Sequence, residues 1–189
     1  MDEKPFKARY RTGLSSGGAR VVIPARRNAF TILFLCAWLG GWYFGETSAI
    51  KEVLNPKTGQ AQGFLLFWLV GWTLGGLWAL VCVLWQLVGS EVLEATSSAL
   101  RHRVEFAGIG FTRNYSTNEI RDLRVSSVNQ DDRSAQQEYF PPLFGRGYGL
   151  ISFDYGARTL RIGSSLDEAE AKGVIEFLRP RLPSSKLTL

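Results

Sequence analysis

The residues that most often carry chemistry are few in this chain and are not grouped in sequence. His102 is the only histidine, and it lies between two arginines with no cysteine or carboxylate cluster beside it. A zinc site needs three or four such ligands at short spacings, so we expect no metal site. Asp131 and Asp132 are adjacent carboxylates. Because neighbouring residues on an extended chain point to opposite sides, we expect no shared acid–base role for this pair.

The remaining candidates for chemistry are weak as well. Cys36 and Cys82 both lie in apolar stretches, where a thiol usually acts as a small apolar side chain. Residues 145–149 (GRGYG) superficially resemble a phosphate-binding loop, but no Lys-Ser or Lys-Thr pair follows them. The chain has no nucleophile elbow, P-loop or dinucleotide-binding fingerprint. The sequence therefore predicts a protein that is not an enzyme, with no catalytic residue and no cofactor.

Apolar patterning is the stronger signal. Residues 29–45 and 58–90 contain no charged side chain. We expect helices over about 29–49 and 63–88, because about 20 helical residues cross the roughly 30 Å hydrocarbon core of a bilayer. These stretches predict a transmembrane helical hairpin within residues 29–89. The absence of ionisable side chains from them argues against a transporter, channel or proton pump.

The charge distribution predicts the orientation of this hairpin. The formal net charge of +5 comes entirely from residues 1–28, a basic N-terminal arm. Such an arm could bind nucleic acid. Here it flanks a hydrophobic segment, so we interpret it as the positive flank that stays in the cytoplasm and expect no nucleic-acid partner. We expect an uncleaved anchor in the inner (plasma) membrane, with both termini cytoplasmic. The charged residues of the arm are Asp2, Glu3, Lys4, Lys7, Arg9, Arg11, Arg20, Arg26 and Arg27.

One pattern occurs in both predicted helices. The motif W-L-x-G-W-x-x-G begins at residue 38 and again at residue 68, so the two copies fall at similar depth in an antiparallel hairpin. Its glycines have small-xxx-small spacing, and we expect them to pack the hairpin on itself or, alternatively, to form a groove for another subunit's helix. Its tryptophans are expected to point away from that packing, toward lipid or a partner in the outer half of the bilayer. The glycines are Gly41, Gly45, Gly71 and Gly75, and the interface aromatics are Trp38, Trp42, Trp68 and Trp72.

Residues 90–181 predict a small folded domain. Short segments of alternating polar and apolar residues are separated by turn residues and predict about six antiparallel strands. The period then changes to that of a helix. Ser165 and Glu168 fit a capping box at its start, and Pro180 ends or kinks it. This order of elements predicts an α+β domain, followed by a tail over residues 182–189.

The domain resembles the bacterial pleckstrin-homology-like (PH-like) family. The resemblance is carried by residues 149–156 (GLISFDYG), 159–163 (TLRIG) and 166–171 (LDEAEA), and by the strand that directly follows a membrane hairpin. It implies an antiparallel PH-like β-sandwich or partial barrel, capped by a C-terminal helix and attached to two membrane helices. It also implies a binding or scaffolding module rather than an enzyme.

The long loop at residues 129–147 is a candidate contact for a partner or for lipid. Loops of this length are usually functional or disordered, and this one concentrates apolar side chains around a Pro-Pro pair. They could contact a membrane or a partner, or they could cover an open end of the barrel as part of the core. The candidate contacts are Tyr139, Phe140, Leu143, Phe144 and Arg146.

Two functions follow from these expectations. The first is an accessory or scaffold subunit whose hairpin packs against a larger membrane complex or against a second copy of the chain. The second is a membrane-tethered PH-like domain that reads anionic lipid or a peptide at the cytoplasmic leaflet, because arginine pairs well with phosphate. The candidate arginines are Arg121, Arg124, Arg133 and Arg146, for which the simpler interpretation is a solvated basic face.

Overall fold

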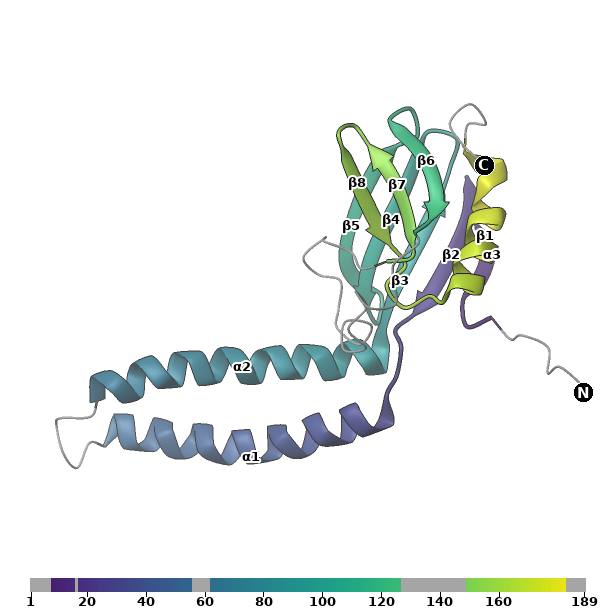
Figure 1. Ribbon diagram of the computed structural model, residues 1–189. Helices are drawn as coiled ribbons and strands as arrows, with labels where there is room; N and C mark the ends of the chain where they lie inside the picture. Colours follow the sequence, from purple (N-terminus) through teal and green to yellow (C-terminus); the bar gives the residue numbers. More distant parts are fainter. Residues whose placement is uncertain (1–7, 16, 56–61, 127–148, 183–189) are drawn as a thin grey trace, which may run out of the picture. The chain divides into compact units, whose positions relative to one another are not determined.

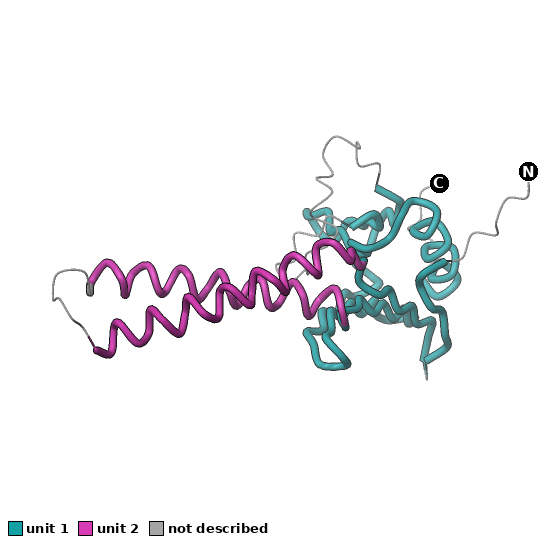
Figure 2. The backbone as a smooth tube through the Cα atoms, turned by 90° about the horizontal axis from the view of Figure 1, so that it is seen from below, with its two compact units in different colours: residues 1–26, 88–189 teal, residues 27–87 magenta. Residues whose placement is uncertain are grey.

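The computed structural model describes residues 8–15, 17–55, 62–126 and 149–182. The chain divides into two units, which differ in secondary structure (Figures 1 and 2). Residues 27–87 form a helical hairpin. Residues 1–26 and 88–189 together form the other unit, the head domain (unit 1 in Figure 2), which contains the strands and a helix.

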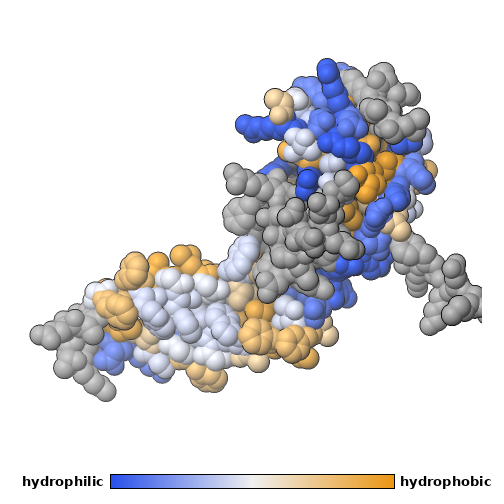
Figure 3. Space-filling model, viewed as in Figure 1, coloured by the Kyte–Doolittle hydropathy of each residue, from blue (hydrophilic) through white to orange (hydrophobic). Residues whose placement is uncertain are grey.

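The hairpin consists of α1 (Ala29–Leu54) and α2 (Gln62–Val88). Asn28 caps α1, because its side chain accepts a hydrogen bond from the Thr31 amide. Both helices are long and apolar enough to cross a membrane. In Figure 3 the visible hairpin surface is orange to white over most of its length, whereas the visible head domain is mostly blue. The two predicted helices are thus present, and α1 continues about one turn beyond its expected end.

The head domain contains two antiparallel sheets. The first has the order β1-β2-β3-β4-β5, and the second has the order β6-β7-β8. The chain then forms helix α3 and a short 3₁₀ turn, η3 (Arg179–Arg181). This confirms a helical hairpin joined to an α+β domain. The elements are β1 (Arg11–Ser15), β2 (Gly18–Pro24), β3 (Gly89–Ala95), β4 (Ala99–Phe106), β5 (Ile109–Ser116), β6 (Ile120–Val125), β7 (Ile151–Tyr155), β8 (Arg158–Ile162) and α3 (Glu168–Leu178).

The N-terminal segment differs from the basic arm expected over residues 1–28. Residues 11–24 form β1 and β2, and β2 pairs with β3 over six register positions from Ala19↔Ala95 to Pro24↔Ser90. Ala19, Val21 and Ile23 alternate along β2 and are buried, so this strand has one core face. The folded head domain therefore includes residues on both sides of the hairpin.

The core of the head domain lies between the sheets and one face of α3. β2, β3 and β4 contribute Val21, Leu93 and Leu100 from the first sheet, and β7 contributes Ile151 and Phe153 from the second. Helix α3 adds apolar side chains at helical spacing, which is how a surface helix covers a sheet. Its buried apolar residues are Ala171, Val174, Ile175 and Leu178.

Helix α3 begins two residues later than the predicted capping box. Asp167 is the N-cap and accepts a hydrogen bond from the Glu170 amide, while Glu170 accepts one from the Asp167 amide. Ser165, the expected cap, is buried before the helix starts. The helix therefore starts with a capping box, but the N-cap residue is Asp167 rather than Ser165.

Candidate functional site

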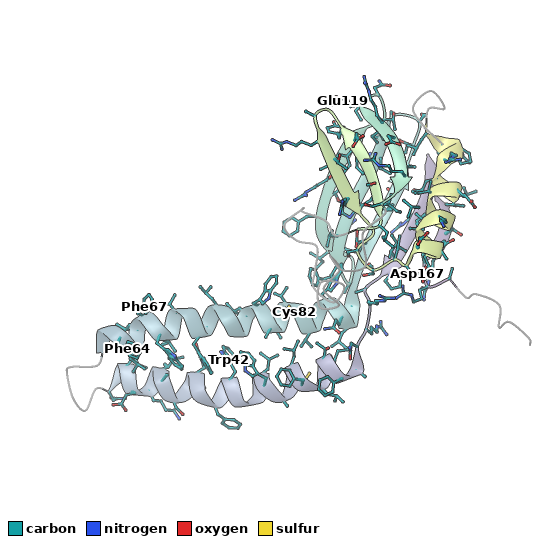
Figure 4. All side chains as sticks on the ribbon, viewed as in Figure 1. Trp42, Phe64, Phe67, Cys82, Glu119 and Asp167 are labelled. Carbon is teal, nitrogen blue, oxygen red and sulfur yellow. The ribbon has the colours of Figure 1, made fainter. Side chains whose placement is uncertain are left out.

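The two copies of the tryptophan–glycine motif meet inside the hairpin. Trp42 projects toward α2 (Figure 4), and its indole Nε1 donates a hydrogen bond to the Trp72 carbonyl at 3.0 Å. The Trp72 ring stacks on Trp68 with centroids 4.7 Å apart, and its centroid is 5.9 Å from that of Trp38. The two copies of the motif therefore lie opposite each other in the hairpin, as expected. The expectation that these tryptophans point away from the helix contact is corrected for Trp42 and Trp72, which contribute to it.

Gly76 makes the Trp42 contact possible. A Cβ at Gly76 would lie 2.1 Å from the Trp42 ring atom Cε2, closer than side-chain carbons approach one another. The missing side chain lets the indole lie against the backbone of α2 and reach a carbonyl there. Gly76 lies outside the motif and was not among the predicted packing glycines. Its neighbour Gly75 is part of the repeat. Because successive residues of a helix are rotated by about 100°, Gly75 lies on a different face of α2 from Gly76.

The four predicted glycines are distributed over different faces of the hairpin. A Cβ at Gly45 would lie 3.6 Å from the Trp72 ring, an ordinary contact distance, so Gly45 lies at the helix contact. Among the described residues, a Cβ at Gly41, Gly71 or Gly75 would meet no atom within 4 Å. These three glycines therefore do not bring α1 and α2 together. They lie on surfaces that another helix could approach closely.

A buried carboxylate lies in the same half of the hairpin. Glu46 follows the charge-free stretch, and α1 continues through it, so the expectation of no ionisable residue within the predicted spans is corrected. Its side chain is only 9% exposed, and Thr73 Oγ1 donates to its Oε1 at 2.6 Å. The same hydroxyl lies 2.8 Å from the Leu69 carbonyl, so one proton is shared between two acceptors.

The environment of the other oxygen of Glu46 is different. Within the part of the chain that the structure describes, Oε2 of Glu46 is buried without a hydrogen bond. An unsatisfied buried carboxylate oxygen is costly, and such residues in membrane helices usually mark a function. The described residues contain no group of three metal-ligating side chains.

The head domain contains a second buried carboxylate, and this one is fully hydrogen-bonded. Glu91 on β3 lies 3.0 Å from His102 Nε2 on β4. Its oxygens also accept hydrogen bonds from the Gly163 and Ser164 amides at 3.0 and 2.9 Å, and from the Ser164 hydroxyl. Burial alone would raise the pKa of Glu91. The hydrogen bond and electrostatic attraction of His102, with the bonds from Ser164 and Gly163, outweigh burial and lower the pKa of Glu91 below its usual value.

This cluster joins parts of the chain that sequence reasoning could not connect. Glu91 follows Gly89 and precedes Leu93 at alternate positions on β3, so it occupies an inward-facing position of the strand. Gly163 has φ +76°, a conformation that favours glycine, and this turn presents two successive amides to the carboxylate. Because both of its carboxylate oxygens are hydrogen-bonded, Glu91 fixes the turn after β8 to the first sheet.

Glu170 on α3 binds the start of the chain in a similar way. It is buried, and its Oε2 lies 2.6 Å from an Arg9 guanidinium nitrogen. Oε1 accepts hydrogen bonds from the backbone amide and Nε of Arg9. Burial favours a higher pKa for Glu170, but the side chain and amide of Arg9, with the Asp167 amide, lower it. At least one cation of the supposed basic arm is therefore part of the folded domain.

Several predicted contacts lie outside the described residues. These are Tyr139, Phe140, Leu143, Phe144 and Arg146, together with Arg133. Of the other candidate arginines, Arg124 pairs with Asp122 and lies 3.3 Å from Asp154, while Arg121 is exposed on β6.

Comparison of the chain with protein-family models, with curated proteins and with solved structures found no match.

Proposed function

We propose that this protein is a non-enzymatic integral membrane protein, an accessory or scaffold subunit whose hairpin packs against a helix of a larger membrane complex. Its head domain serves as a PH-like binding module at the cytoplasmic face. The observation that carries this proposal is the open glycine face of α2. Gly71 and Gly75 are exposed and lie one turn apart, and no atom of the residues that the structure describes lies within 4 Å of a Cβ at either position.

The flanking side chains favour a helix as the occupant of this face. Phe64 and Trp78 lie on the same side of α2 at helical spacing from the two glycines, and both are exposed. Small residues bordered by large ones form a shallow groove that lets a second backbone approach closely, and close packing drives helix association in lipid. The contact of α2 with α1 uses a different face, which includes Gly76 and Trp72.

The proposed orientation has both termini in the cytoplasm. β2 precedes α1 and β3 follows α2, and these two strands pair directly. Segments that form one sheet must lie on the same side of a membrane. The excess of lysine and arginine before α1 favours the cytoplasmic side.

The test is co-purification from the native membrane in mild detergent, with identification of the bound proteins by mass spectrometry. We expect Gly75→Val to lose the partner while the hairpin still folds, because the added side chain occupies the open face of α2 and a Cβ at this position meets no atom of the described residues within 4 Å. Gly63→Val is the matched control, since Gly63 is equally open but lies near the start of α2. A wild-type chain that purifies alone, or a partner that survives Gly75→Val, would contradict the proposal.

A second function is supported by the outer face of the second sheet. Arg121, Arg124 and Arg161 project from β6 and β8 on the side that carries Asp154. A PH-like domain that reads anionic lipid or an acidic peptide would use such a surface. Loss of binding to anionic vesicles in Arg121→Ala/Arg161→Ala, with neutral vesicles as the control, would favour this alternative.

A further inference from the structure

Two large apolar side chains are exposed at one end of the first sheet. Ile109 is 82% exposed and Phe111 is 77% exposed, and both lie at the start of the edge strand β5. Their cross-strand partners are Phe106 and Val104, so the two side chains share one face of the sheet. Exposed apolar side chains that adjoin one another on a folded domain mark an interaction site more often than single ones do.

The strand register places these side chains beside the point where the chain leaves α2. Gly89 pairs with Phe106, and Phe106 pairs with Ile109. The Ala107 amide donates a hydrogen bond to the carbonyl of Val88, the last residue of α2, at 3.2 Å. β3 runs away from Val88, and β4 returns to it. The turn between β4 and β5 therefore lies beside Val88 and Gly89.

One cation lies close to this turn. Arg103 on β4 lies 3.2 Å from the Glu105 carboxylate, whereas Arg101 and Arg113 lie farther along the strands, level with Asn114 and His102. The Arg103 guanidinium donates to the Gly108 carbonyl, which brings a cation to the turn itself. Basic side chains near the cytoplasmic leaflet are attracted by its anionic lipids.

We propose that the β4–β5 turn inserts into the cytoplasmic leaflet of the bilayer that the hairpin crosses. Ile109 and Phe111 lie below the headgroups, and Arg103 lies at the level of the phosphates. This inference rests on the proposed membrane-spanning hairpin. A lipid surface is favoured over a second copy of the chain, because the apolar pair adjoins Val88, the last residue of α2, and the Arg103 guanidinium lies at the same turn.

The test uses the full chain reconstituted in vesicles of neutral and anionic phospholipid. An environment-sensitive fluorophore is attached to single cysteines from Ile109→Cys, Phe111→Cys and Leu14→Cys, in a chain with Cys36→Ala and Cys82→Ala. Quenching by nitroxide-labelled lipid is compared with quenching by iodide in the water. Leu14 is the matched control, because it is 78% exposed. It pairs with Ala19, which in turn pairs with Ala95, so Leu14 lies at the opposite end of the sheet. All three side chains are exposed, so labelling leaves the core intact.

We expect the lipid quencher to reduce emission at positions 109 and 111 several-fold more than at position 14, and iodide to do the reverse. Iodide quenching at 109 and 111 equal to that at 14 would overturn the inference. Shielding of both positions from both quenchers would also overturn it, because it would place protein over the turn. Native Cys36, which is exposed on α1, is labelled in a separate Cys82→Ala chain. If lipid nitroxides quench Cys36 but not position 111, only this inference fails; if they do not quench Cys36, the membrane hairpin fails as well.

Discussion

Glu91 shows how a single buried carboxylate stabilises the head domain. Its folded-state pKa is lowered, because His102, Ser164 and Gly163 favour the ionised form more strongly than burial opposes it. A depressed pKa contributes stability that is fully present above the unfolded value of about 4.3 and is lost as pH falls through the folded value. Glu170, whose pKa is also lowered, adds to the same acid sensitivity.

We therefore predict that the free energy of unfolding of the head domain falls at low pH, and that it falls less steeply with pH in Glu91→Gln. At neutral pH the variant is less stable by about 1.5–3 kcal/mol, the usual contribution of a hydrogen bond to a charged group. Amide hydrogen exchange of β3 and β4 peptides in the full chain, corrected for intrinsic rates, measures both effects. Glu168→Gln is the control, since the Glu168 carboxylate is exposed and bonded to Lys172 at the surface. Equal acid sensitivity of Glu91→Gln and the unchanged chain would contradict the prediction.

Glu46 and Glu91 differ in how far the sequence reveals their environments. Glu91 lies in an alternating strand pattern, but its partners His102 and Ser164 are brought to it only by strand pairing and by the turn after β8. Glu46 directly follows a charge-free stretch, and hydropathy alone suggests that the helix leaves the membrane there. The contact with Thr73 on α2 instead buries it within the hairpin. In both cases long-range contacts, which local patterns do not encode, decide the role of the carboxylate.

At the scale of elements, the sequence contains two possible capping boxes for the start of α3. The spacing of Ser165 and Glu168 fits a capping box, and so does that of Asp167 and Glu170. The helix uses the second pair, because Glu170 is also held by Arg9 and is buried, whereas Glu168 is exposed and pairs with Lys172. Tertiary contacts thus choose between two local signals of similar strength.

We predict that Asp167→Ala destabilises the head domain by about 1 kcal/mol, the usual cost of removing an N-cap side chain. Ser165→Ala is the matched control and should change stability much less, since Ser165 Oγ has no hydrogen-bond partner among the described residues. Protection of α3 amides against hydrogen exchange distinguishes the two variants. A larger loss of stability in Ser165→Ala than in Asp167→Ala would contradict this prediction and identify Ser165 as the N-cap residue.

The hairpin and most strands of the head domain follow from local patterns, whereas β1 and β2 do not. Long apolar stretches specify α1 and α2 directly, and alternation specifies strands such as β8. β2 shows the same alternation in Ala19, Val21 and Ile23, but the basic residues around it suggest a membrane flank instead. Only its pairing with β3, across the whole hairpin, identifies it as a strand of the sheet. The order of the strands could therefore not be predicted from the sequence.

At the scale of the whole molecule, the hairpin takes the place of a loop between two neighbouring strands. β2 and β3 are paired antiparallel, and the Ala25 amide donates to the Gly89 carbonyl at 3.0 Å. A two-residue turn closes such a pair, and Asn-Gly is the favoured sequence for it. We predict that replacing residues 26–88 by Asn-Gly yields a folded head domain that needs no detergent.

The matched control for this replacement is residues 90–189 alone. That fragment lacks β1 and β2, and with them Val21 and Ile23, whose burial contributes about 1.5–3 kcal/mol each. The loss is comparable with the whole stability of a small domain, about 5–15 kcal/mol. We expect the fragment to aggregate or remain unfolded, while the Asn-Gly protein gives a cooperative thermal transition by circular dichroism. If residues 90–189 fold as well as the joined protein, β1 and β2 are dispensable, and the sheet does not depend on both ends of the hairpin.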